Sequence, residues 1–346
     1  MRLCAPPATA VAEAGMAASV KAVGVVEAKD WLEIERQLAQ KESELLRGEG
    51  VDVPADHLQG YTYTPQTRVV DKQPWDIVPA PNCVPKCSSS NWSHADVNFE
   101  VGDGIAYITL NRPQANNALN DSMMQGIHDA CFELHMRQDI RVVVLRAEGK
   151  MFCAGGDPRI FQEAAAMSDA ANRKSAISFM KLLYFFQCLP QLTVGLAQGS
   201  AMGTGLGLLA ACDIVCTVSS ARFVASEVKL GTCPATIAPA LSAKIGPAYA
   251  KRVLCTAENV SAPLAKQMGL VTDIVDDEMD FTKYVESVCD KVTLCAPLAA
   301  ARSKRLVQNV SARPLTLRLL SYAGGELEDV RLGEEAVKGM AAVQIK

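Results

Sequence analysis

The chain has 346 residues, of which 49% are hydrophobic and 21% charged, with a net charge of −4 and a pI near 5.7. This length can bury a sizeable core and suggests one large domain with additional segments. A mildly acidic chain lacks the basic surface that binds phosphate backbones, so nucleic acid is excluded as a main partner. The twelve cysteines are scattered, many inside apolar runs, which indicates buried thiols in a reducing compartment, as at Cys153, Cys188, Cys212 and Cys255.

Residues 1–96 are interpreted as an N-terminal extension. The alanine-rich start is too weakly apolar for a secretory signal and too poor in arginine for a mitochondrial presequence. We therefore expect a cytoplasmic protein, with an organelle as the alternative. Apolar residues at helical spacing predict a helix over 27–47, and the proline-rich sequence over 48–96 predicts an extended arm.

Residues 97–279 carry the pattern of an α/β core. Runs typical of strands cover 105–110 and 141–146, and a helical pattern covers 121–138 between them. Strands that alternate with helices favour a sheet with largely parallel pairing. The sequence therefore predicts an α/β domain over this range.

The uncharged stretch 182–212 is long enough to raise the question of a membrane span. A proline and five glycines interrupt it, so it predicts a buried strand, turn and helix, and no membrane partner. The sequence after this core, 280–346, is expected to be a C-terminal helical region. Its helices are predicted over 281–294, 297–309 and 314–339.

Two glycine-rich turns, 152–157 (FCAGGD) and 199–205 (GSAMGTG), each follow a strand-like run and lead toward a helical one. Glycine and alanine leave backbone N–H groups unshielded, and a helix N-terminus adds partial positive charge. Two such amides that converge form an oxyanion hole, which stabilises negative charge on a carbonyl oxygen. The pattern indicates acyl or enolate chemistry.

Both turns resemble signatures of the crotonase (enoyl-CoA hydratase/isomerase) superfamily. Further family-like segments occur in the same order as in that superfamily, at 108–113, 117–120, 211–214, 226–231 and 269–271. The resemblance covers roughly residues 98 to 340. It implies a spiral of ββα repeats and a C-terminal helical region that packs subunits into a homotrimer or homohexamer. It also implies an acyl-CoA or acyl-carrier thioester as substrate and no cofactor.

The resemblance also implies roles for individual residues. The oxyanion donors would be the amides of Ala154 and Thr204, and the backbone of Ala118 would meet the adenine end of CoA. The basic residue usual before Asn117 is missing, so phosphate contacts are expected from Lys304 or Arg305. The other substrate-binding positions of the two turns are Gly155, Gly156, Asp157, Gly203 and Gly207. For Asp157, a cap on the following helix is the alternative role.

Glu227 is the expected acid. It follows a strand-like run in an apolar setting, where burial raises a carboxyl pKa toward the range useful for proton transfer. The alternative is a structural glutamate that pairs with Lys229 or caps its segment. The resemblance places Glu227 at the family's proton-transfer position and places Gly207 where a two-glutamate hydratase has its second acid.

A single acid leaves several activities open. The segment from 226 to 246 is most similar to hydratases and dehydratases that act on 3-methylglutaconyl-type thioesters, so hydration or dehydration is ranked first. A Δ3,Δ2-enoyl-CoA isomerase is second, and a non-catalytic scaffold with this fold is the alternative outside enzymes. Hydrolysis loses support because Ala235, not an aspartate, follows Pro234.

Metal and triad chemistry receive no support from the sequence. The four histidines lie outside every glycine-rich or acidic motif, which disfavours a Ser-His-Asp device and a zinc site. The pair Cys83 and Cys87 is interpreted as two ordinary loop thiols.

Overall fold

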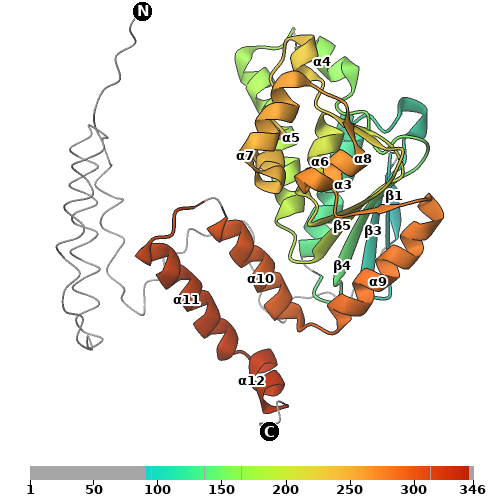
Figure 1. The fold of residues 1–346 in the computed structure, drawn as a ribbon. Coiled ribbons are helices and arrows are strands. Elements are labelled where there is room, and N and C mark those ends of the chain that lie inside the picture. The colour runs from blue at the N-terminus through green and yellow to red at the C-terminus, as the bar shows by residue number, and fades with distance from the viewer. Residues whose placement is uncertain (1–90, 95, 136, 165, 312, 343–346) are drawn as a thin grey trace, which may run out of the picture. The chain divides into compact units, whose positions relative to one another are not determined.

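A computed structural model describes residues 91–342 except 95, 136, 165 and 312 (Figure 1). All of them belong to one compact unit, Lys72–Lys346. The helix expected over 27–47 and nearly all of the expected arm lie outside the described residues. The boundary at residue 96 stays a prediction, although the strand Trp92–His94, which the sequence placed in the arm, already pairs with the main sheet.

The main sheet has seven strands in the order β1-β2-β3-β4-β5-β7-β10. The first three pair antiparallel, and every later pair is parallel, as predicted for an α/β core. A smaller sheet has the order β6-β8-β9. The strands are β1 (Trp92–His94), β2 (Val97–Gly102), β3 (Ile105–Leu110), β4 (Val142–Ala147), β5 (Leu192–Ala197), β6 (Ala201–Met202), β7 (Ile214–Val218), β8 (Arg222–Val224), β9 (Val260–Ser261) and β10 (Asp273–Val275).

The strand sequences follow from their places in the sheet. In β4, the run Val142 to Leu145 is buried on both faces, which is why it is continuously apolar. Strand β2 lies between antiparallel partners near the sheet edge, and its first residues alternate between buried Val97 and Phe99 and partly exposed Asn98.

Helices cover the sheet and fill the region of the second glycine-rich turn. Helix α6 is buried at every residue and packs against both α5 and α7. In the uncharged stretch, strand β5 and helix α6 match the predicted buried strand and helix, whereas the helical start at the end of α5 and the short strand β6 were not predicted. The helices are η3 (Pro113–Ala115), α3 (Asp121–His135), α4 (Pro158–Ala164), α5 (Asp169–Gln187), α6 (Thr204–Ala211), η4 (Glu227–Leu230), α7 (Ala238–Thr256), α8 (Ala262–Met268), η5 (Glu278–Asp280), α9 (Phe281–Thr293), α10 (Pro297–Val310), α11 (Leu317–Arg331) and α12 (Glu334–Ala341). Within the described part of the chain, no helix has the length and apolar character needed to cross a bilayer.

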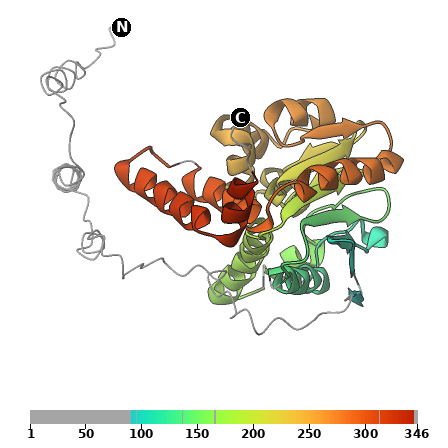
Figure 2. The same ribbon diagram turned by 90° about the horizontal axis from the view of Figure 1, so that it is seen from below.

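The C-terminal region differs from expectation in one respect. The single helix predicted over 314–339 is wrong, because the chain breaks at Gly333, which is extended and precedes α12. Helix α11 starts later than expected, at a cap in which the Thr316 side chain accepts from the Leu319 N–H. Helices α10 and α11 lie side by side (Figures 1 and 2).

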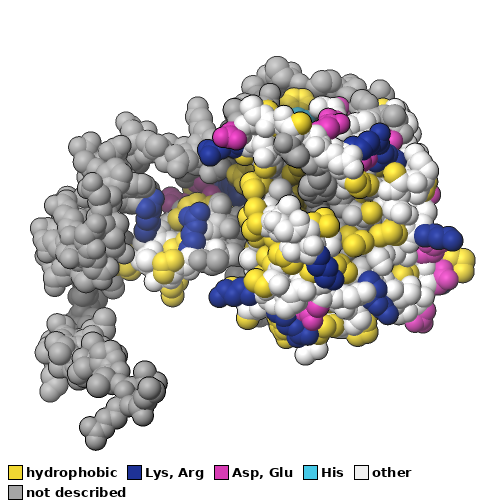
Figure 3. Space-filling model, turned by 90° about the horizontal axis from the view of Figure 1, so that it is seen from above, with side chains coloured by type: hydrophobic (Ala, Val, Ile, Leu, Met, Phe, Trp, Pro, Cys, Tyr) yellow, Lys and Arg dark blue, Asp and Glu magenta, His cyan; other side chains and the backbone are white. Residues whose placement is uncertain are grey.

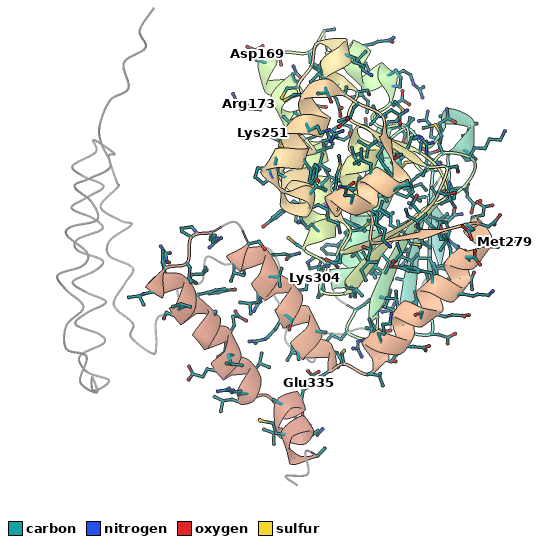
Figure 4. The ribbon with its side chains drawn as sticks, viewed as in Figure 1. Asp169, Arg173, Lys251, Met279, Lys304 and Glu335 are labelled. Atoms are coloured by element: carbon teal, nitrogen blue, oxygen red, sulfur yellow. The ribbon has the colours of Figure 1, made fainter. Side chains whose placement is uncertain are left out.

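Polar contacts fix α10 to the core and α12 to α10. Lys304 Nζ lies 2.6 Å from Asp213 Oδ2 and donates to the Gln191 carbonyl at 2.8 Å. The Glu335 carboxylate of α12 accepts from two backbone N–H groups in the first turn of α10 (Figure 4). Large apolar side chains stay exposed here, as expected for an assembly surface: Leu315, Leu320, Leu327, Leu332, Val337 and Met340.

The cysteines follow the expectation in part. Cys153 and Cys212 are buried and Cys188 is half-buried, and all the described cysteines are free thiols. Cys255 is exposed, so the expectation of burial is wrong there. It lies in the last turn of α7, where the helix reaches solvent.

Candidate active site

The two glycine-rich turns meet directly. The Met202 N–H donates to the Cys153 carbonyl at 2.9 Å. Gly155 has φ +98°, and a side chain there would place its Cβ 3.0 Å from the Met202 carbonyl oxygen. Only glycine allows this conformation and this close approach.

Gly203 brings the second turn against the expected acid. Its φ is +48°, and a Cβ at this position would lie 3.0 Å from Glu227 Oε1 and 3.7 Å from the Gly155 Cα. The structure therefore brings Gly155, Gly203 and Glu227 together from three separate segments. Any side chain at Gly203 would push into the carboxylate.

The backbone amides correct one expectation. The Ala154 N–H donates to the Asn116 carbonyl at 2.9 Å, so this amide is not available as an oxyanion donor. The residues on either side of Gly156 both form backbone hydrogen bonds with Leu119. This pairing directs the N–H of Gly156 itself away from Leu119. Among the described residues the partly exposed Gly156 N–H has no partner. Thr204 is the first residue of α6, so its N–H has no partner within the helix.

Glu227 opens the 3-10 helix η4 directly after the small sheet. Its side chain is half-buried, and Oε2 is sealed from solvent with no hydrogen-bond partner among the described residues. Burial raises the pKa of this carboxyl above its usual value of 4.5. Lys229 is exposed and forms no ion pair with Glu227, so the pairing of these two side chains, one of the two structural alternatives for this glutamate, loses support.

The raised pKa of Glu227 gives a pH-dependent stability. Ionisation of Glu227 is easier in the unfolded chain, so its stabilising contribution is complete below pH 4.5 and is lost as the pH rises through the native pKa. We expect the Glu227→Gln variant to become progressively more stable than the wild type as the pH rises above about 4.5. Denaturant unfolding of both proteins from pH 4 to pH 8 measures the difference, and a constant difference would contradict the burial argument.

Gly207 has no room for a side chain. A Cβ there would lie 2.5 Å from Ile237 Cγ2 and 3.0 Å from Leu183 Cδ1. The place where a two-glutamate hydratase has its second acid is thus filled by side chains from α5 and the start of α7.

Asp157 forms several hydrogen bonds that stabilise the first glycine-rich turn. It is 4% exposed and accepts hydrogen bonds from Nε, Nη2 and the backbone N–H of Arg159, and from Arg112 Nη1 at 2.8 Å. These hydrogen bonds, foremost that from the Arg159 side chain, hold the pKa of Asp157 well below its usual range. The contact with the Arg159 N–H at the start of α4 agrees with the helix-cap alternative.

We expect Asp157→Asn to lower the free energy of unfolding by roughly 1.5–3 kcal/mol, the contribution typical of a hydrogen bond to a charged group. The stabilisation is present above the ordinary carboxyl pKa of 3.8 and is lost as the pH falls through the lowered native value. Denaturant unfolding at neutral and acidic pH checks both statements. The exposed Asp276→Asn is the matched control, and equal stability of the two variants at neutral pH would contradict the prediction.

The expected CoA contacts are only partly supported. The Ala118 N–H donates to Ala115 and its carbonyl accepts from Arg112, so the backbone keeps one acceptor lone pair at most for an adenine. Lys304 is largely buried against Asp213, and Arg305 forms an ion pair with the Glu326 carboxylate. The structure assigns both cations to internal contacts, which corrects their expected role at the phosphates.

Two residues of the site escaped the sequence reasoning. Arg112 joins Asp157 to the Ala118 carbonyl. The fully buried Asn117 binds the Arg112 N–H and the carbonyls of Glu148 and Met151, which fixes the approach to the first turn. An available signal was the Asn-Asn pair, because asparagine tolerates the left-handed backbone found at 116 and 117.

An apolar cavity adjoins the 3-10 helix that begins at Glu227. This cavity of about 290 Å³ is lined by Val228 of η4 and by residues of the following loop and α7, among them Pro234 and Ala250, but by none of the expected site residues. Hydrophobic side chains gather toward the middle of the face shown in Figure 3, and charged ones are scattered. No cluster of metal-binding side chains occurs among the residues that the structure describes.

Residues 100–321 match the family model described as enoyl-CoA hydratase/isomerase. The chain belongs to this family. It is 31% identical over 205 residues to enoyl-CoA hydratase AKT6-1 of Alternaria alternata, covering 59% of this chain and 67% of that protein. It is 30% identical over 214 residues to the short-chain-enoyl-CoA hydratase of Clostridium acetobutylicum, covering 61% of this chain and 80% of that protein.

Solved structures of the family share the fold. Pseudomonas aeruginosa AtuE superposes with a TM-score of 0.68 at 31% identity, covering 71% of this chain and 95% of that chain. The expected crotonase fold is confirmed. The hydratase relatives, at about 30% identity, support acyl-CoA hydratase activity at the level of the enoyl-CoA hydratase/isomerase family.

Proposed function

We propose that this member of the family adds water to, or removes it from, the α,β bond of an acyl thioester, with Glu227 as its only carboxyl acid. The observation that carries the proposal is the buried, unpartnered Glu227 Oε2 in a carboxylate that lies against Gly203 of the second glycine-rich turn. A buried acid with a raised pKa is suited to proton transfer near neutral pH.

The proposed oxyanion donors are the amides of Gly156 and Thr204. The Gly156 amide replaces that of Ala154, because the Ala154 N–H is already bound to Asn116. In hydration, the thioester oxygen takes up negative charge as the water oxygen bonds to the β-carbon. Two preorganised N–H donors stabilise that enolate, and Glu227 moves the proton from the water to the α-carbon.

A double-bond isomerase is the second candidate. The observation that favours it is the packing of Ile237 and Leu183 at Gly207, because a shift of a double bond needs a proton carrier but no second carboxylate to hold water. A non-catalytic scaffold would not need a buried carboxyl group with a raised pKa, so the presence of Glu227 disfavours the scaffold function.

Product analysis separates these functions. The protein is incubated with 3-methylglutaconyl-CoA, crotonyl-CoA and a 3-enoyl-CoA, and with the same acyl groups on pantetheine; the products are followed by mass for the addition of water and by proton NMR for the position of the double bond. Gain of one water supports the hydratase, and a shifted double bond at unchanged mass supports the isomerase. No conversion of any thioester would overturn both.

Assembly is proposed to use the C-terminal helices. The exposed apolar side chains of α11 and α12, among them Leu320 and Leu327, would be covered in a homotrimer or homohexamer. Light scattering at micromolar concentration gives the subunit count, and a monomer would contradict the proposal.

A further inference from the structure

The Thr204 hydroxyl is an unusual group in this site. Thr204 is 6% exposed, yet its hydroxyl has no hydrogen bond to any residue that the structure describes. The hydroxyl oxygen keeps some exposure to solvent, so a small ligand can reach it.

Thr204 lies one helical turn from Gly207, the position at which a two-glutamate hydratase has its second acid. Thr204 and Gly207 are three residues apart and therefore lie on one face of the helix, with Thr204 one turn nearer the N-terminus. Ile237 and Leu183 occupy the space at Gly207. The first polar side chain on this face is thus the hydroxyl of Thr204.

The Glu227 carboxylate lies beside the residue that precedes Thr204. Its Oε1 would be 3.0 Å from a Cβ at Gly203, whereas its Oε2 is closed to solvent. A water molecule that donates to Glu227 Oε1 and hydrogen-bonds the Thr204 hydroxyl would bridge the two side chains.

We propose that the Thr204 hydroxyl and the Glu227 carboxylate hold the water that is added to the substrate. This inference rests on the hydratase function proposed above. The water oxygen forms a bond to the β-carbon, and one water proton passes through Glu227 to the α-carbon, which takes the electron pair of the former double bond. Thr204 accepts a hydrogen bond from the O–H that the product retains, and so acts as a water-positioning residue.

The test compares two reactions of the same active site. Hydration of the unsaturated thioester needs the positioned water. Exchange of the α-proton of the matching saturated thioester with D₂O needs Glu227 and the oxyanion donors but adds no water. Thr204→Val removes the hydroxyl at constant shape, Thr204→Ser keeps it, and Thr204→Ala covers the case in which valine is not accommodated. Melting temperatures of all variants verify folding.

Loss of one neutral hydrogen bond corresponds to about a tenfold change in rate. We expect Thr204→Val to reduce the kcat of hydration about tenfold more than it reduces α-proton exchange, and Thr204→Ser to retain hydration. An equal fall in both reactions would overturn the inference in favour of a hydroxyl that binds the thioester oxygen, and unchanged hydration would overturn it outright. A wild type that exchanges the α-proton but hydrates nothing would overturn the proposed function, and the inference with it.

Discussion

Replacing Glu227 with glutamine is expected to reduce turnover by about 10²–10⁴-fold, the usual contribution of a general acid or base. Glutamine keeps the size of the side chain and cannot carry the proton, so the fold and thioester binding should persist. Steady-state rates on the substrate identified by mass give the loss, and calorimetry with a saturated thioester gives the binding constant.

The matched control for this substitution is Glu278→Gln, which removes an exposed carboxylate on η5 far along the chain from the glycine-rich turns. Its rate should equal that of the wild type. A Glu227→Gln protein with nearly wild-type turnover would eliminate Glu227 as the proton carrier, whatever the control shows.

Introducing glutamate at Gly207 is expected to destabilise the protein without creating a two-acid hydratase. Even the Cβ would collide with Ile237 at 2.5 Å, and the carboxylate would enter an apolar environment. Overpacking of a core costs about 1–3 kcal/mol, and an unpaired buried charge adds to that. We expect a melting temperature lower by several degrees and no gain in the hydration rate.

A second glycine provides the control for Gly207→Glu. Gly324 on α11 has no neighbouring atom within 4 Å of its Cβ position, so Gly324→Glu should leave the melting temperature nearly unchanged. Combining Gly207→Glu with Ile237→Ala should recover part of the lost stability. A stable Gly207→Glu protein that hydrates faster than the wild type would contradict the packing argument.

Much of the core was predictable because its signals are local. The valine run of β4 and the interrupted uncharged stretch around β5 and α6 predicted buried elements correctly, and the two glycine-rich turns were correctly identified as backbone-exposing segments. Their direct contact depends on pairing between Cys153 and Met202, which no local pattern reveals. The family resemblance supplied that connection.

The errors concern partners that come from elsewhere in the chain. The Ala154 amide looked available because its neighbours are small, but the carbonyl that binds it belongs to Asn116, on a different segment. Lys304 was expected to contact the phosphates of CoA, yet it lies against Asp213 and the Gln191 carbonyl. Sequence shows which groups can bind, and tertiary structure decides which of them are already bound.

Helix α6 connects a proposed oxyanion donor to the C-terminal helix α10. At its start Thr204 carries a proposed oxyanion donor, and beyond its last turn the carbonyls of Cys212 and Asp213 accept from Lys244 while the Asp213 carboxylate binds Lys304 of α10. Eight residues of helix are about 12 Å long and stiff. The helix therefore moves as a rigid body. A displacement of α10 is expected to shift the Thr204 N–H at the other end of α6, and with it the donor for the thioester oxygen. In a homotrimer or homohexamer, subunit packing against α10 would thus set the position of the oxyanion donor that stabilises the enolate.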